Sequence, residues 1–226
     1  MALLEVKNLS ISFGGLKAVD NFQISIEKGQ LYGLIGPNGA GKTTIFNLLT
    51  GVYKPDAGSI ELAGVNITGR KTTEINQAGI ARTFQNIRLF GALTVFENVL
   101  IAKHMRAKQN VFSATLRLNH AEEKRMREES MELLEMQGLA HLKDEIASSL
   151  PYGLQRRLEI ARALATSPSL LLLDESAAGM NPQETQDLTD FIHKIRDDYH
   201  LTIFMIEHHM DLVMQISDRI YVLDFG

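Results

Sequence analysis

Residues 36–44 read GPNGAGKTT, and this stretch decides the expected fold. A glycine, four residues of any type and a second glycine precede Lys42 and Thr43, which is the pattern of a phosphate-binding loop. Its glycines let the backbone turn successive N–H groups toward phosphate oxygens. The lysine reaches the β- and γ-phosphates, and the hydroxyl can bind Mg²⁺. The alternative is an ordinary glycine-rich turn that carries an exposed lysine.

The flanking residues favour the phosphate-binding loop over the ordinary turn. Residues 30–35 (QLYGLI) suit a buried strand, and residues 42–50 carry apolar side chains at helical spacing before Gly51. A helix that starts at the loop adds the partial positive charge of its N-terminus. The residues predicted to bind the nucleotide are Gly36, Asn38, Gly39, Ala40, Gly41, Lys42, Thr43 and Thr44.

Two acids follow a second buried strand. The four leucines 170–173 run directly into Asp174 and Glu175. Ligands bind at the carboxyl edge of an open α/β sheet, and paired acids there are costly unless they serve a function. We expect Asp174 to hold Mg²⁺ through a water and Glu175 to polarise an attacking water. The alternative is an acid pair that the dipole favours at the start of a helix.

Two further polar residues carry a weaker signal on their own. His208 follows the apolar run 202–206 (TIFMI), where it could contact the γ-phosphate or the attacking water. A lone histidine at the end of a strand is more often structural. Gln85 lies in the stretch 82–90 (RTFQNIRLF) and by itself indicates little.

The hydrophobic pattern divides the chain into three regions. Apolar and polar residues alternate through the first quarter, which predicts antiparallel strands with one buried face. Residues 122–135 predict a charged helix that ends before Gly138. Beyond residue 167, apolar runs alternate with one face of a helix, and this order implies a parallel sheet. The apolar members of that helical face are Leu188, Phe191, Ile192 and Ile195.

Composition limits the class of protein. The 226 residues carry 23 basic and 27 acidic side chains, and the net charge of −4 argues against a protein that coats nucleic acid. Because there is no cysteine, disulfides, thiolate zinc sites and cysteine nucleophiles are excluded. No apolar run approaches the ~20 residues that span a bilayer, and we expect no signal peptide at the start.

Together, these motifs resemble the ATP-binding subunit of an ABC transporter over nearly the whole chain. The resemblance makes residues 36–44 a Walker A motif, Gln85 a Q-loop and residues 150–155 a signature region. It makes residues 170–174 a Walker B strand and His208 an H-loop. The order and spacing of these motifs are specific to the family.

The resemblance implies an α/β fold, namely a P-loop NTPase core with an N-terminal antiparallel β layer and an inserted α-helical subdomain. A single domain would span residues 1–226, with the core and β layer at 1–86 and 157–226. The helical subdomain would occupy about 87–156. A long insertion from about Lys103 to Glu129 fits, within this family, the ATPases of branched-chain amino acid importers.

The resemblance also implies a chemistry, the hydrolysis of ATP with Mg²⁺. Thr43, Gln85 and Asp174 would set the metal, Glu175 would act as general base or position the water, and His208 would hold the γ-phosphate. The expected catalytic residues are Glu175, His208, Lys42 and Gln85.

Other contacts to ATP follow from the same resemblance. Phe13 would stack on adenine, although a strand phenylalanine is just as compatible with the core. Pro151, Tyr152 and Gly153 would face the γ-phosphate bound by a second protomer.

Several stretches resemble the ATPases of branched-chain amino acid importers in particular. They are FGGLKAV at 13–19, RTFQNIRLF at 82–90, LTVFENV at 93–99, RRLEIARAL at 156–164, AAGMNP at 177–182 and IEHHMDLVMQISDRIYVL at 206–223. The implied partners are two transmembrane permease subunits, a second ATP-binding subunit and, indirectly, an extracytoplasmic solute-binding protein. The implied location is the cytoplasmic face of the cell membrane. Urea import, lipopolysaccharide export and a weakly hydrolysing regulatory ATP switch remain alternatives.

The signature region departs from the family pattern. It usually reads LSGGQ, whereas residues 150–154 read LPYGL. Pro151 offers neither a hydroxyl nor an N–H, although proline suits the first turn of the helix expected through residues 156–164. A lost hydrogen bond to a charged group is worth about 1.5–3 kcal/mol, so we expect a weaker ATP-driven dimer than a serine would give.

Asn181 stands where the family generally carries an aspartate. With Pro182 and Glu184 it also has the pattern of a capped helix start. A cap and a role at the subunit interface therefore compete for this residue.

Overall fold

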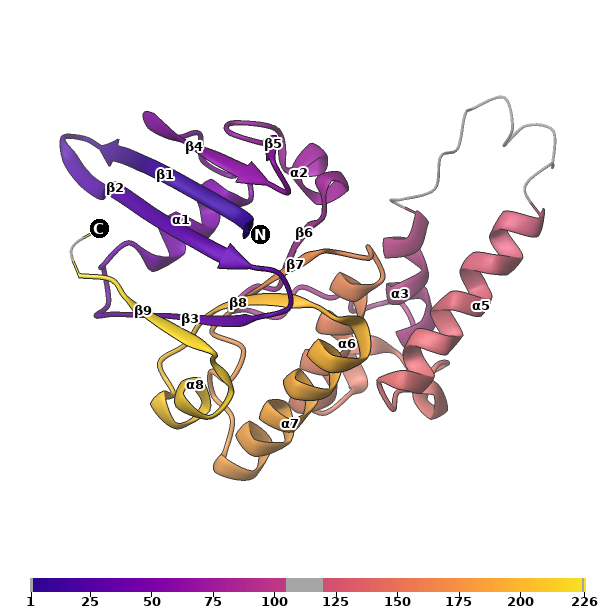
Figure 1. Ribbon diagram of the computed structural model, residues 1–226. Coiled ribbons are helices and arrows are strands. Elements are labelled where there is room, and N and C mark those ends of the chain that lie inside the picture. The colour runs from indigo at the N-terminus through magenta and orange to yellow at the C-terminus, as the bar shows by residue number, and fades with distance from the viewer. Residues whose placement is uncertain (1, 105–119, 225) are drawn as a thin grey trace. The chain divides into compact units, whose positions relative to one another are not determined.

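A computed structural model describes all of the chain except residues 1, 105–119 and 225 (Figure 1). Most of the insertion expected at 103–129 therefore lies outside the described residues. The chain forms two compact units, residues 1–85 with 168–226, and residues 86–167.

The first unit contains an antiparallel sheet in the order β2-β1-β4-β5. Its strands are β1 (Ala2–Phe13), β2 (Leu16–Glu27), β4 (Ala57–Leu62) and β5 (Val65–Asn66). The predicted alternation is confirmed for Leu4 with Val6 and for Leu9 with Ile11, which are buried, and an irregularity between Val6 and Leu9 shifts the register. Phe13 breaks the pattern because it is 44% exposed at the end of β1.

The second sheet of this unit is parallel, in the order β6-β7-β8-β3-β9. Its strands are β3 (Leu31–Ile35), β6 (Ile80–Arg82), β7 (Leu170–Asp174), β8 (Thr202–Ile206) and β9 (Arg219–Val222). Every residue of β7 and β8 is buried, as their continuous apolar runs predicted. Because parallel strands share a carboxyl edge, the ends of β3, β6, β7 and β8 meet on one side of the sheet.

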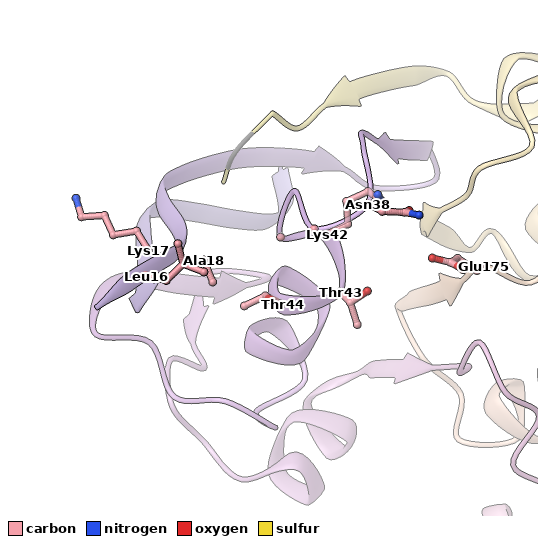
Figure 2. A pocket seen from close by; sticks show the side chains of 10 residues that line it. Leu16, Lys17, Ala18, Asn38, Lys42, Thr43, Thr44 and Glu175 are labelled. Atoms are coloured by element: carbon pink, nitrogen blue, oxygen red, sulfur yellow. The ribbon is translucent and has the colours of Figure 1, made fainter. Parts of the chain in front are cut away.

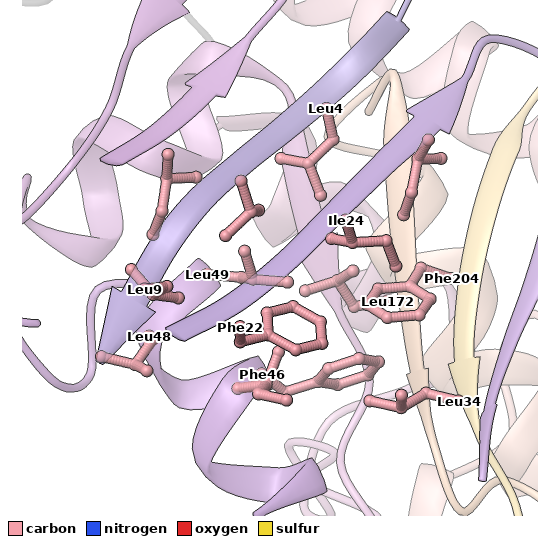
Figure 3. Packing of buried hydrophobic residues seen from close by; sticks show 14 of the residues in the cluster. Leu4, Leu9, Phe22, Ile24, Leu34, Phe46, Leu48, Leu49, Leu172 and Phe204 are labelled. Atoms are coloured by element: carbon pink, nitrogen blue, oxygen red, sulfur yellow. The ribbon is translucent and has the colours of Figure 1, made fainter. Parts of the chain in front are cut away.

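Among the described residues of the first unit, four helices accompany the two sheets. They are α1 (Lys42–Leu49), α2 (Thr72–Ala78), α7 (Pro182–Tyr199) and α8 (Met210–Ile216). Phe46 of α1 lies in one buried cluster with Phe22 of β2 and with Leu172 and Phe204 of the parallel sheet (Figure 3). The rings of Phe46 and Phe204 are 5.2 Å apart. This shared core fixes α1 between the two sheets.

The start of α7 forms the predicted capping box. The Asn181 side chain accepts from the Glu184 backbone N–H at 2.9 Å, and the Glu184 carboxylate accepts from the Asn181 N–H at 2.9 Å. Pro182 occupies the first helical position. The cap at Asn181 is therefore confirmed, and the predicted apolar face of α7 is buried.

The second unit is helical. Its described residues form α3 (Val95–His104), α5 (His120–Met136), the short turns η1 (Ala140–Leu142) and η2 (Ala147–Ser149), and α6 (Tyr152–Leu164). The unit includes α6, which packs against α3 and which the sequence boundary at 157 would have split. α5 is followed by Gly138 at a φ of 70°, as its sequence predicted. No described helix combines the length and hydropathy needed to cross a bilayer.

Candidate functional site

The loop between β3 and α1 forms one wall of a cavity of about 290 Å³ in the first unit (Figure 2). Gly39 and Gly41 have φ values of 82° and 100°, which L side chains rarely adopt. A Cβ at Gly41 would lie 2.4 Å from the carbonyl oxygen of Ala18. At Gly41, therefore, both the backbone angle and the space require glycine.

The cavity brings the predicted loop residues together with β2 and with one of the predicted acids. Figure 2 shows Glu175 directed toward the loop from the opposite wall. Gly36 and Ala40 shape the loop, and Ala40 is buried. The lining residues are Leu16, Lys17, Ala18, Asn38, Gly39, Gly41, Lys42, Thr43, Thr44 and Glu175.

Lys42 is held inside the loop and is 5% exposed. Its Nζ donates to the carbonyl oxygens of Gly36 at 2.7 Å and Pro37 at 2.9 Å. Burial lowers the pKa of Lys42, and the negative charges of Glu175 and Asp174 oppose that shift. The lysine and both acids therefore lie at the same edge of the sheet.

Glu175 is the centre of a polar cluster that joins three strand ends. Its Oε2 accepts from Nε2 of Gln85 at 2.7 Å, and its Oε1 lies 3.0 Å from Nε2 of His208. Gln85 follows β6, Glu175 follows β7 and His208 follows β8. The structure thus brings together three of the four predicted catalytic side chains.

The backbone of Glu175 is held in an uncommon conformation. Its φ of 47° lies in the left-handed region, which a residue other than glycine adopts at a cost. The Glu175 N–H donates to the carbonyl oxygen of Ile206 at 2.8 Å, which ties the turn to β8. Such strain is typical of functional sites, where the surrounding structure maintains it.

Asp174 contacts a buried cation that the sequence did not single out. Nη2 of Arg82 donates to Oδ2 of Asp174 at 2.6 Å, and the side chains are only 6% and 5% exposed. The signal in the sequence was weak, namely one charge at the end of the short apolar strand β6. The partner 92 residues away could not be read from it.

The oxygen donors at this edge suit Mg²⁺. Thr43 offers a hydroxyl, Asp174 a carboxylate and Gln85 an amide oxygen, all hard ligands of the kind that Mg²⁺ prefers. Among the described residues, no cluster of three or more histidine, cysteine, aspartate or glutamate side chains could hold a metal by itself. Mg²⁺ commonly binds through one or two carboxylates together with substrate phosphates, so the residues present fit it.

Comparison with known proteins decides the family. The ABC transporter family profile matches residues 19–178. The chain belongs to the ABC transporter family. The resemblance that the motifs indicated is therefore confirmed, and so is the α/β fold class.

Relatives of this ABC protein are similar over nearly their full length. LivG of Escherichia coli (strain K12), a high-affinity branched-chain amino acid transport ATP-binding protein, is 46% identical, with 99% of this chain and 89% of LivG covered. BraF of Pseudomonas aeruginosa, which carries the same description, is 45% identical at the same coverage. A crystal structure of the ADP conformation of an ABC transporter ATP-binding cassette has a TM-score of 0.88 at 34% identity, covering 100% of this chain and 89% of that one.

Phe13 lies outside the lining of the cavity, at the exposed end of β1. Its ring packs edge-on against Tyr53 with centroids 5.2 Å apart, and Tyr53 is 37% exposed. Because Phe13 is itself 44% exposed, the alternative of a core position is wrong. Stacking on adenine stays a prediction.

The signature residues of this ABC protein lie at the start of α6 in the second unit. Pro151 is the residue before the helix, with φ −53° and ψ 150°, and α6 begins at Tyr152. The expectation that Pro151 lies within the first turn is therefore wrong, because its ψ is extended rather than helical. Tyr152 is 41% exposed, and its hydroxyl accepts from Nη2 of Arg156 at 3.2 Å.

Glu207 is a buried acid beside the cluster of Glu175 and His208 that the sequence did not single out. It follows β8 directly, is 2% exposed, and its Oε1 accepts from the Ala177 N–H at 2.9 Å. Burial raises the pKa of Glu207 above its ordinary value. The charge of Glu175 adds to this, while the backbone N–H groups of Ala177 and His208 and the charge of His209 oppose it.

The Glu207→Gln substitution is expected to stabilise the fold increasingly as pH rises. A carboxyl group whose pKa is raised on folding binds its proton more tightly in the folded state. Its contribution to the free energy of unfolding is therefore fully present below about pH 4.5 and is lost as pH rises through the folded pKa. The variant carries no charge there, so its unfolding free energy relative to wild type should rise by at most about 1.4 kcal/mol per pH unit in that window.

Urea unfolding at a series of pH values from about 5 to 8 measures this difference. Glu5→Gln makes the same chemical change at a partly exposed position on β1 and serves as the matched control. A pH-independent difference in unfolding free energy between Glu207→Gln and wild type would contradict the raised pKa of Glu207.

Proposed function

We propose that this chain is the ATP-hydrolysing subunit of an ABC transporter that imports branched-chain or related amino acids. The observation that carries the hydrolytic part is the convergence of Gln85, Glu175 and His208 opposite the loop that holds Lys42. The solute assignment is supported by 46% identity to LivG over 99% of the chain.

The loop and α1 bind the phosphates of ATP in this proposal. Backbone N–H groups of residues 36–44 and the N-terminus of α1 attract the anion. Lys42 exchanges its two carbonyl acceptors for the β- and γ-phosphate oxygens. Thr44 lines the same cavity. Phosphoryl transfer depends mainly on such positioning and charge stabilisation.

Glu175 activates the attacking water. As the water oxygen bonds to the γ-phosphorus, its proton passes to the Glu175 carboxylate, and the bond to ADP breaks. Gln85 contacts one oxygen of that carboxylate and His208 contacts the other, so the two residues fix its orientation. His208 can also turn its ring to the γ-phosphate. Gln85 contacts Glu175 through Nε2, and in this proposal its amide oxygen binds the metal.

Thr43, Asp174 and Gln85 would hold Mg²⁺. When bound, the ion neutralises charge on the phosphates of ATP. The side chains arrive from α1, β7 and the segment after β6. The protein thus supplies oxygen ligands on three separate elements of one unit.

The partners follow from the same proposal. Pro151, Tyr152 and Gly153 face the nucleotide of a second ATP-binding subunit, and two permease subunits carry the solute across the membrane. The solute reaches them from an extracytoplasmic binding protein, so this chain works at the cytoplasmic face of the cell membrane. No nucleic acid is involved.

Mg²⁺-dependent phosphate release tests the proposal. The purified chain is expected to bind ATP and to release phosphate only with Mg²⁺, so chelation by EDTA should abolish release. Because permease subunits can be needed for the full rate, calorimetric binding of Mg-ATP is measured in parallel. A protein that binds no Mg-ATP would overturn the proposal.

Co-purification with the membrane subunits, followed by a screen of amino acids on the associated receptor, tests which solute is transported.

A regulatory ATP switch is the second candidate. Pro151 favours it, since it precedes α6 with no side-chain hydrogen bond to the helix and no N–H of its own. ATP binding without phosphate release, even with the membrane subunits present, would select this candidate.

A further inference from the structure

Arg82 is a buried cation at the last position of β6. It lies in register with Leu172 of β7, two residues before Asp174. An isolated charge at this depth is strongly unfavourable, so its partners must be well placed. Within the described residues, its Nε reaches no acceptor although it is buried. A buried arginine with an unsatisfied Nε contributes little to the stability of the core, which points to another role for Arg82.

The guanidinium of Arg82 connects three elements. Nη2 donates to Oδ2 of Asp174 on β7 at 2.6 Å. Nη1 donates to Oδ1 of Asn47 on α1 at 2.7 Å and lies 3.4 Å from Oγ1 of Thr50, just after that helix. The planar fork of an arginine can hold both partners at once, whereas the single nitrogen of a lysine cannot do so in the same geometry.

Two aromatic rings restrict the guanidinium further. Its central carbon lies 5.6 Å from the ring centroid of Phe46 and 5.0 Å from that of Phe84. Phe46 belongs to the core cluster that fixes α1, and Phe84 directly precedes Gln85. The position of Arg82 is therefore set by packing as well as by hydrogen bonds.

Asn47 and Thr43 lie four residues apart, and therefore on the same face of α1. A hydrogen bond that fixes Asn47 also restrains the position of Thr43. Arg82 thus holds α1 one turn beyond the hydroxyl assigned to the metal, and it holds the carboxylate assigned to the same metal. Both ligands belong to the first unit and are joined through one side chain.

We propose that Arg82 is a positioning residue that sets the Asp174 carboxylate and the start of α1 relative to each other for binding of the metal–nucleotide complex. This role rests on the proposed function. In the described part of the chain, the hydrogen bonds and ring contacts of Arg82 go to residues outside the cavity lining, so it acts through Asp174 and Asn47.

The Arg82→Lys variant tests the role while keeping the charge. The probe is the non-hydrolysable analogue adenylyl imidodiphosphate, titrated by calorimetry with increasing Mn²⁺. The metal concentration at half-maximal gain in affinity should rise about tenfold or more, as for other residues that orient metal ligands. Affinity measured in EDTA should stay unchanged, because Lys42 and the loop are intact.

Asn47→Ala provides a second variant that leaves the Arg82–Asp174 ion pair in place. Losing only the anchor on α1, it should move the Mn²⁺ midpoint in the same direction by a smaller factor. Arg196→Lys is the matched control, since Arg196 is a partly buried, ion-paired arginine away from the site. Its midpoint should equal that of wild type.

The outcomes separate this inference from the proposed function. Wild-type Mn²⁺ midpoints in both Arg82→Lys and Asn47→Ala, with only a lower melting temperature, would show a structural role and overturn the inference alone. A wild-type protein that binds no analogue with Mn²⁺ would overturn the proposed function and the inference with it.

Discussion

Replacing Glu175 by glutamine is expected to lower ATP turnover by a factor of about 10²–10⁴, the usual contribution of a general base. The substitution keeps the size of the side chain and an oxygen that can accept from Gln85. It removes the negative charge and the ability to take a proton from the attacking water. ATP binding should persist, because the loop and Lys42 are unchanged, so the ATP-bound dimer should accumulate.

Single-turnover phosphate release and size-exclusion chromatography with ATP measure these two effects. Glu5→Gln makes the same chemical change at a partly exposed position paired with Lys7, and should retain wild-type turnover. Wild-type turnover in Glu175→Gln would reject the general-base role, whereas lost ATP binding would show that Glu175 acts in binding instead.

The Lys42→Ala substitution is expected to weaken ATP binding by about 10–150-fold, corresponding to a charge-assisted hydrogen bond of about 1.5–3 kcal/mol. The ammonium is already fixed within the loop by the carbonyls of Gly36 and Pro37. It therefore loses little conformational freedom when phosphate replaces these acceptors.

Isothermal titration calorimetry with ATP measures the loss. Lys7→Ala removes an exposed lysine from β1 and should bind as wild type does. Thermal unfolding of Lys42→Ala separates lost affinity from lost structure, since the two loop carbonyls also lose their donor. Equal affinity for ATP in folded Lys42→Ala would contradict the role of the loop.

Local sequence determined the parts of this protein that depend on local backbone geometry. The stretch 36–44 specified its own loop, since Gly39 and Gly41 adopt positive φ angles that L side chains rarely adopt. The apolar runs of β7 and β8 specified buried parallel strands, and Asn181 with Glu184 specified the start of α7. Such features need only neighbours within a few residues, so a single sequence contains them.

Tertiary structure alone decided which side chains meet. Gln85 and Glu175 are 90 residues apart, yet they share a hydrogen bond because β6 and β7 are adjacent in the sheet. Arg82 and Glu207 were not predicted as site residues because a single charged residue forms no periodic pattern. Their burial and their distant partners depend on the tertiary structure. The sequence thus determined the loop and the acids, and strand order determined how they form one site, since hydrogen bonds and ion pairs depend on distance in space.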